Sequence, residues 1–155
     1  MKFSVSISGY GANGAAPVTI LCVFDEGTGV LVAGKSVAFK ESRVEGFAMV
    51  TNLELAERDF LFTNEHLRDA IRDYNARSGQ GLIDISDELS RWKPDNKVDL
   101  VGVDERGPKY QLSPDIGNGE VAILAAVAFI TAQEPITGAI DAMSEFNELY
   151  RITAI

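Results

Sequence analysis

The chain contains one cysteine and one histidine among its 155 residues, and this scarcity excludes several kinds of site. Cys22 has no second cysteine with which to form an internal disulfide, and its apolar surroundings indicate a buried, inert thiol. A lone His66 leaves no Cys/His cluster for zinc and no Ser-His-Asp order for acyl transfer. We therefore expect a protein of the reducing cytoplasm without a metal framework.

Long apolar runs are also missing. The longest, Val121 to Ile130, has about half the length that a membrane span requires, so it predicts a core helix rather than a membrane anchor. The amino terminus begins directly with an alternating strand pattern and carries no apolar signal-peptide segment. These features agree with a cytoplasmic protein that does not interact with membranes.

Positive charge is in short supply, with 14 basic residues against 23 acidic ones and a net charge of -9. Proteins that bind duplexes gain much of their affinity from Lys and Arg placed against phosphates, so nucleic acid is a disfavoured partner. The nearest approach to a basic cluster is interleaved with acids; its members are Arg68, Arg72 and Arg77 among Glu65, Asp69 and Asp73. The acidity suits a basic protein partner or mimicry of a nucleic acid, and solubility explains it equally well.

The first third of the chain predicts a three-strand meander. Lys2 to Ser8 alternates apolar and serine residues at the strand period, and Val18 to Phe24 is a continuous apolar strand. Asp25 to Gly29 is typical of a hairpin turn, and Val30 to Phe39 returns as the third strand. A flexible glycine-rich loop, Gly9 to Pro17, joins the first two strands.

The apolar period then changes to that of a helix. Ser42 is a candidate N-cap for a helix reaching Leu55, and further elements follow in alternation. The remaining predictions are a strand at Asp59–Thr63, a helix from Leu67 to about Ser78, a short helix from about Ser86 to Trp92, a strand at Val98–Val103, a loop at Glu105–Gly119 and helices at Val121–Ala132 and after Pro135.

This order predicts an α/β (α+β) fold, a five-stranded mixed sheet with helices on both faces. The sheet would contain the three-strand antiparallel meander plus two further strands. We expect a single domain over 1–155, in which 135–155 forms a C-terminal helical extension.

Four local motifs, in this order, resemble the ribonuclease H-like superfamily from about Phe3 to about Ala132. They are Ser8-Gly9 with Asn13-Gly14, Ser42-Arg43-Val44-Glu45 before Ala48-Met49-Val50, Leu61-Phe62-Thr63-Asn64 before Leu67, and Gly117-Asn118-Gly119-Glu120. The resemblance implies a site of four carboxylates that hold two metal ions. In this chain, Ser8 and Asn64 stand where the family has two of these carboxylates. The position of the carboxylate at the final family helix falls nearest Ala122, and Glu120 is the acidic residue close to it. The family's histidine-bearing loop is replaced by Asp104 to Gly117, which has none.

The resemblance therefore implies a degenerate site at Ser8, Glu45, Asn64 and Glu120. Two-metal hydrolysis requires several carboxylates around a pair of divalent ions, and one glutamate with a serine and an amide supplies too little charge. We expect no catalytic residue and no cofactor. If a metal binds at all, Glu45 and Glu120 would be its ligands, with Mg²⁺ or Mn²⁺ as the ion.

Structural roles compete with this interpretation. Ser42-x-x-Glu45 matches a capping box, Asn64 suits an N-cap, and His66 suits an exposed position in the first turn of a helix. Asp25 and Glu26 favour turn formation, and Trp92 favours packing beneath the preceding loop. Asp104 and Glu105 end a predicted strand, where charged loop residues are common.

Three functions remain open. The first is a non-catalytic binding or regulatory domain, a kind of protein that suits a viral or mobile-element accessory factor. The second is a metal-dependent nuclease with a rearranged acidic site built from Glu45, Glu120, Asp104 and Asp25. The third is a self-assembling subunit, a homo-oligomer paired through the last two predicted helices.

Overall fold

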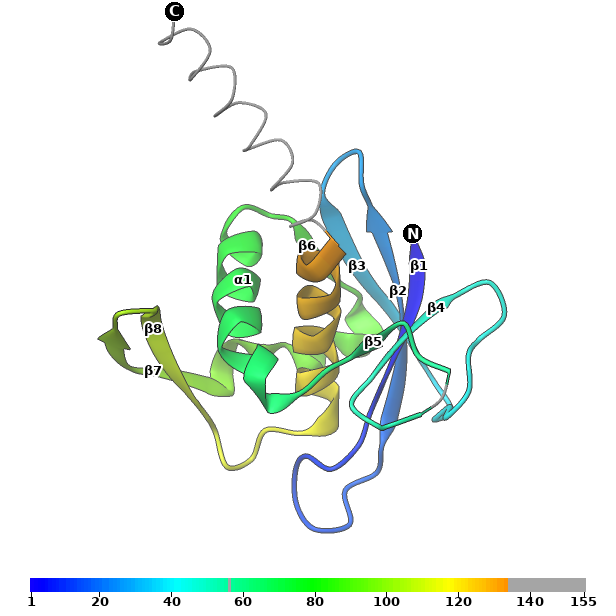
Figure 1. Ribbon diagram of the computed structural model, residues 1–155, viewed down its shortest axis with the longest axis horizontal. Coiled ribbons are helices and arrows are strands. Elements are labelled where there is room, and N and C mark those ends of the chain that lie inside the picture. Colours follow the sequence, from blue (N-terminus) through cyan, green and yellow to red (C-terminus); the bar gives the residue numbers. More distant parts are fainter. Residues whose placement is uncertain (56, 134–155) are drawn as a thin grey trace, which may run out of the picture.

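A three-strand antiparallel meander forms the middle of the sheet, as the alternating pattern predicts. In the computed structural model, which describes residues 1–55 and 57–133, its strands are β1 (Lys2–Ile7), β2 (Val18–Asp25) and β3 (Val30–Val37) (Figure 1). Phe3 lies opposite Cys22 and Cys22 opposite Ala33, so apolar side chains of all three strands face the same side. The side chains of Phe3, Cys22 and Ala33 are fully buried.

Three short parallel strands extend the meander on both sides. β4 (Ala48–Thr51) lies parallel to β1, β5 (Phe60–Leu61) parallel to β4, and β6 (Ile83–Ile85) parallel to β3. Over the described residues, the sheet therefore has six strands in the order β5-β4-β1-β2-β3-β6. The prediction of a mixed sheet is confirmed, but the predicted count of five strands is wrong.

The prediction of a helix from Ser42 to Leu55 is wrong, because the middle of this segment forms the strand β4. Val50 faces the core while Met49 faces the opposite side, and both are fully buried. A strand covered on both faces has no polar side and can therefore be mistaken for the apolar stripe of a helix. Gly46, with φ +83°, precedes the strand, and the Asp59 carboxylate accepts the Met49 N–H (2.8 Å) while pairing with Arg43.

Both long helices of the described residues lie on one face of the sheet (Figure 1). These are α1 (Leu67–Gly79), which follows the short 3-10 helix η1 (Asn64–His66), and a helix over 118–133. Within 1–55 and 57–133, the expectation of helices on both faces is wrong. The other face is crossed by the connection 38–47, where the Lys40 N–H donates to Thr19 Oγ1 (2.9 Å). This non-helical crossover takes the place of a covering helix.

The helix over 118–133 is the core of the molecule. Every residue from Val121 to Ile130 is at most 9% exposed, so the predicted core helix is confirmed. The Phe129 ring contacts Phe3 of β1 (4.9 Å between centroids) and Phe60 of β5 (5.8 Å). A helix that is apolar all round must be enclosed on every side. The sheet encloses it on one side and α1 on the other (Figure 1).

A second, two-stranded sheet stands apart from the first. Beyond the 3-10 helices η2 (Asp87–Trp92) and η3 (Pro94–Asn96), β7 (Val98–Asp104) pairs with β8 (Gly107–Leu112) as a hairpin. The strand predicted at Val98–Val103 exists, but it does not join the main sheet. The loop predicted at Glu105–Gly119 is wrong in part, because it contains β8. The hairpin extends away from the body at the left of Figure 1.

Trp92 is partly buried and packs against the hydrophobic core. Its indole ring lies so close to Gly119 that a Cβ at that position would approach the ring within 2.2 Å. Gly119 is the second residue of the helix over 118–133. The absence of a side chain there is what allows the short 3-10 segment to pack against the start of the core helix.

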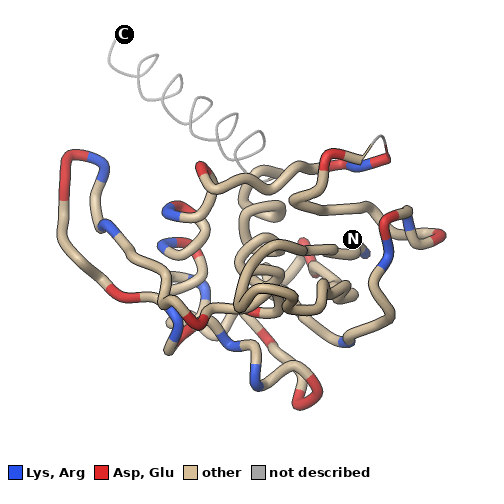
Figure 2. Tube along the Cα trace, turned by 90° about the horizontal axis from the view of Figure 1, so that it is seen from below, with Lys and Arg blue, Asp and Glu red and all other residues tan. Residues whose placement is uncertain are grey.

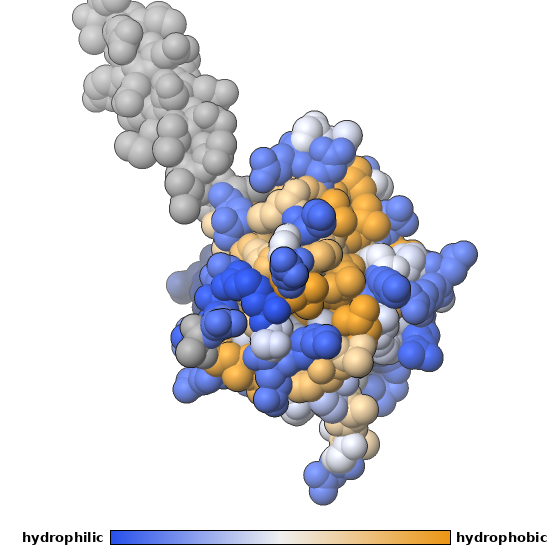
Figure 3. All heavy atoms as spheres, turned by 90° about the vertical axis from the view of Figure 1, so that its right-hand side faces the viewer, coloured by the Kyte–Doolittle hydropathy of each residue, from blue (hydrophilic) through white to orange (hydrophobic). Residues whose placement is uncertain are grey.

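The outer face of the sheet is partly apolar. Figure 3 shows an apolar band across this face, and the register places Leu21, Val23 and Val32 on it, with Val23 46% exposed. The predicted extension at 135–155 lies outside the described residues. Among the described residues, no helix has the length and apolarity that a membrane crossing requires.

Candidate functional site

A pocket of about 410 Å³ opens where three neighbouring parallel strands end. Ser8 follows β1, Asn52 follows β4 and Phe62 follows β5, so the lining comes from the carboxyl ends of all three. Ligand sites of open α/β sheets gather at such ends, where the loops diverge. The lining residues are Ser8, Gly9, Tyr10, Asn52, Glu54, Leu61, Phe62, Thr63 and Asn64.

Asn52 joins the ends of β1 and β4. Its Oδ1 accepts the Ser8 N–H (3.1 Å), and its Nδ2 donates to the Ser8 carbonyl oxygen (2.6 Å). This pair of bonds continues the ladder between the two strands through a side chain. The floor of the pocket is therefore held by the amide of Asn52 rather than by a charge.

Tyr10 connects the pocket to the core helix. Its backbone N–H donates to Asn118 Oδ1 (2.8 Å), and its hydroxyl donates to Asn64 Oδ1 (2.6 Å). Asn118 in turn donates from Nδ2 to the Ala16 carbonyl (2.8 Å), which ties down the glycine-rich loop at both ends. Burial raises the pKa of Tyr10 above its ordinary value, so the phenol is neutral and acts as a donor at physiological pH.

Two of the four predicted site residues meet in this pocket, and two do not. Ser8 and Asn64 both line it. Glu45 is exposed and precedes β4, so it lies near the amino end of that strand while the pocket lies at the carboxyl end. Glu120 is 7% exposed and accepts the Gly117 N–H (3.1 Å) at the start of the core helix. Its carboxylate therefore caps the helix over 118–133.

The structure does not give Glu45 and Asn64 the helix-capping roles that the sequence predicts. Glu45 caps no helix, because no helix begins at Ser42. The N-cap before η1 is Thr63, so Asn64 is the first residue of that helix instead of its cap. His66 completes the cap through Nδ1, which accepts the Thr63 N–H (3.0 Å), and its ring lies near Phe60 and Phe62. His66 is thus half-buried and structural, rather than freely solvated.

The pocket residues that the sequence analysis missed are Tyr10, Asn52, Glu54 and Thr63. Asn52 and Glu54 were missed because the apolar pattern of β4 predicts a helix. A polar residue that follows a helix does not indicate a site at the end of a strand. Tyr10 lies in a loop whose path is set by Asn118, more than one hundred positions away. Thr63 was visible as the end of a predicted strand, two residues beyond β5.

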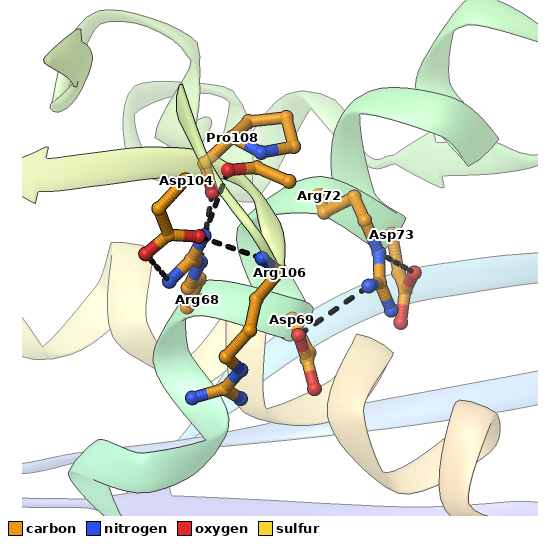
Figure 4. Close-up of polar contacts among 8 residues, drawn as sticks. Arg68, Asp69, Arg72, Asp73, Asp104, Arg106 and Pro108 are labelled. Atoms are coloured by element: carbon orange, nitrogen blue, oxygen red, sulfur yellow. Dashed lines mark hydrogen bonds and ion pairs between the residues drawn. The ribbon is translucent and has the colours of Figure 1, made fainter. Parts of the chain in front are cut away.

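Other acidic residues considered for a nuclease have structural partners. Asp25 Oδ1 accepts the Gly27 N–H (2.9 Å), a turn bond that lowers the pKa of Asp25. Asp104 forms a two-pronged ion pair with Arg68, and this guanidinium lowers the pKa of Asp104 from 3.8 to about 2 (Figure 4). Both carboxylates serve to fix backbone and side chains.

The chemistry available to the pocket follows from its lining. It holds two amides, three hydroxyls and one carboxylate, Glu54. A pair of Mg²⁺ or Mn²⁺ ions requires several anionic oxygens, and this lining does not supply them. Across 1–55 and 57–133, no three His, Cys, Asp or Glu side chains gather closely enough to hold a metal ion. The arrangement is suited to hydrogen bonding with a neutral or cationic group.

No family model, no curated protein and no solved structure matches this chain. The geometry of the described residues is therefore the basis for a functional assignment.

Proposed function

We propose that the chain is a non-catalytic ribonuclease H-like domain that acts as an accessory protein by binding a protein partner. Support for the fold comes from the antiparallel meander, extended on the side of β1 by two parallel strands. The motif at Ser42–Glu45 gives no support, since it precedes a strand. The resemblance therefore depends on the sheet and on Ser8 and Asn64.

The composition of the pocket is the observation that carries the proposal. Ser8 and Asn64, at the positions where the resemblance expects carboxylates, lie in one pocket with a single acidic residue, Glu54. A hydroxyl and an amide bind no divalent ion tightly, but they donate and accept hydrogen bonds. A site of this kind favours recognition over hydrolysis.

The charge of the chain favours a basic partner. With a net charge of -9, the surface attracts proteins of positive charge at a distance and repels phosphate backbones. Figure 2 shows acidic and basic positions interspersed along α1 and the hairpin, an arrangement that gives a nucleic acid no continuous basic track.

Restoring carboxylates to the pocket provides a sharp test. We expect the native chain to give no heat in calorimetry with millimolar Mn²⁺ and to leave an RNA–DNA hybrid intact. The double variant S8D/N64D places two new carboxylates in the pocket beside Glu54, so it should bind Mn²⁺ measurably. Its binding would prove that the assay detects a site in this pocket. Hybrid cleavage by the native chain, abolished by Glu54→Gln, would overturn the proposal.

The self-assembly alternative loses part of its support. It requires the apolar segment Val121–Ile130 to be available for pairing between subunits, and that segment is buried inside one subunit. The other helix that it invoked lies outside the described residues.

A further inference from the structure

β7 gathers most of the exposed apolar surface of the hairpin. Leu100 is 62% exposed, Val101 55% and Val103 75%, all within four positions of one strand. Single exposed apolar residues are ordinary, whereas a contiguous group on a protruding element marks an interaction site. The hairpin extends from the body of the molecule (Figure 1), and the exposed fractions of these side chains show that they are accessible.

A bulge aligns the apolar residues of the hairpin on one face. The register passes from Leu100–Tyr110 directly to Gly102–Lys109, so Val101 is an extra residue and the alternation shifts by one. Leu100 and Val103 consequently share a face with Tyr110. Tyr110 packs against the core, while Leu100 and Val103 continue the same apolar face beyond it into solvent.

In the part of the chain that the structure describes, no strand lies beside the outer edge of β7. Among the described residues β7 pairs only with β8, and no other backbone group bonds to it. An edge strand presents unpaired N–H and C=O groups, which is the template that strand addition requires. This edge therefore offers backbone hydrogen bonds as well as apolar contacts.

Arg68 holds this edge in place. From α1, its Nε donates to the Pro108 carbonyl (2.8 Å) and its Nη2 to the Gly107 carbonyl (2.8 Å), while its Nη1 donates to Asp104 Oδ2 (2.9 Å) (Figure 4). One guanidinium thus joins the helix to both strands of the hairpin. A pre-positioned edge loses less conformational entropy when a partner binds.

Charge selects among the candidate occupants. β7 carries two acidic residues, Asp99 and Asp104, and no basic one. A second copy would oppose one acidic strand with another, on chains that each carry a net charge of -9. An extended segment with alternating apolar and basic residues would place its cations near Asp99 and its apolar side chains on Leu100 and Val103.

We propose that β7 is a docking edge to which an extended segment of a basic protein partner adds as a third strand. This inference rests on the proposed binding function and names its surface and the character of its partner. It does not involve the pocket, so nuclease activity of the native chain would overturn the proposed function while leaving this edge to be judged by its own test.

The test uses two synthetic peptides of equal length, one alternating Lys with Val and one alternating Glu with Val. We expect the Lys–Val peptide to bind in fluorescence anisotropy and to slow hydrogen exchange at the β7 amides. The Glu–Val peptide should bind at least tenfold more weakly. The double variant L100T/V103T, which keeps strand-forming residues but removes the apolar contact, should weaken Lys–Val binding at least tenfold.

The matched control is Val23→Thr, a comparable change on the outer face of the main sheet, which should leave binding unchanged. Thermal unfolding confirms that each variant is folded. The proposal is overturned by equal binding of the two peptides, by L100T/V103T binding like the native chain, or by no protection of β7 at millimolar peptide. A dimer in sedimentation that L100T/V103T abolishes would also overturn it, because the occupant would then be a second copy.

Discussion

β1 and β7 are both strands rich in apolar residues, yet the molecule uses them in opposite ways. In β1, Phe3, Val5 and Ile7 are fully buried, and the intervening Ser4 and Ser6 are buried as well. In β7, Leu100, Val101 and Val103 are more than half exposed. Among the described strands, β1 has a neighbour on each side, whereas β7 has β8 alone.

The difference teaches that a strand pattern specifies local conformation without specifying burial. The connection 38–47 crosses the sheet face that bears the serines of β1, and the core helix covers the other face. β7 receives neither cover along its outer half. Burial depends on what packs against a strand, so apolar strand residues form a core in one place and an open edge in the other.

The largest effect should come from matched truncations in the two strands. Ile7→Ala in β1 should lower the free energy of unfolding by about 2 to 5 kcal/mol, because it leaves a cavity in a closed core. Leu100→Ala in β7 should change it by less than about 0.5 kcal/mol, because water already surrounds that side chain. Urea unfolding measures both, and similar losses in the two variants would contradict the comparison.

The buried polar side of β1 gives the next effect. Thr19 Oγ1 shares a hydrogen bond with Ser6 Oγ (2.8 Å) and accepts the Lys40 N–H (2.9 Å), in a fully buried position. Thr19→Val should cost about 1 to 3 kcal/mol, because it leaves the Ser6 hydroxyl and the Lys40 N–H without a partner. Ser6→Ala combined with Thr19→Val should cost less than the sum of the two changes. Strict additivity in urea unfolding would show that the pair does not interact.

The attachment of β7 can be broken selectively at Arg68. Arg68→Ala should raise the hydrogen-exchange rates of the β7 and β8 amides at least tenfold and leave those of β1 unchanged, because the guanidinium donates its hydrogen bonds to residues of the hairpin.

Arg72→Ala is the matched control, since Arg72 pairs with Asp69 and Asp73 inside its own helix (Figure 4). If both variants released the hairpin equally, Arg68 would not be its anchor.

Acid should produce the smallest effect. Asp104 has a pKa of about 2 in the folded chain against an ordinary 3.8, because Arg68 stabilises its charged form. A pKa lowered by folding means that the contribution of this pair is complete above about pH 4 and is lost as the pH falls through about 2. NMR titration of the Asp104 carboxyl should give this low midpoint and show hairpin amides shifting with it. In Arg68→Ala the midpoint should rise toward 3.8, and an unchanged midpoint would show that Arg68 is not the cause.

For the candidate site, the sequence located Ser8 and Asn64 at strand ends, and the structure brings them into one pocket. The prediction for Glu45 is wrong, because β4 has apolar residues on both of its faces and their spacing resembles the apolar stripe of a helix. The sequence could not show that Asn52 would join β1 to β4, nor that Tyr10 would bond to Asn118 and Asn64. Those contacts depend on where distant segments meet.

By itself, the sequence determined the meander, α1, the core helix and the strand that became β7, because side-chain periodicity and turn residues act over a few positions. Only the tertiary structure decided that β4 and β6 would complete the sheet, that Glu120 would cap a helix and that β7 would remain open. These outcomes depend on which surfaces cover one another, and that is settled by the packing of segments far apart in the chain.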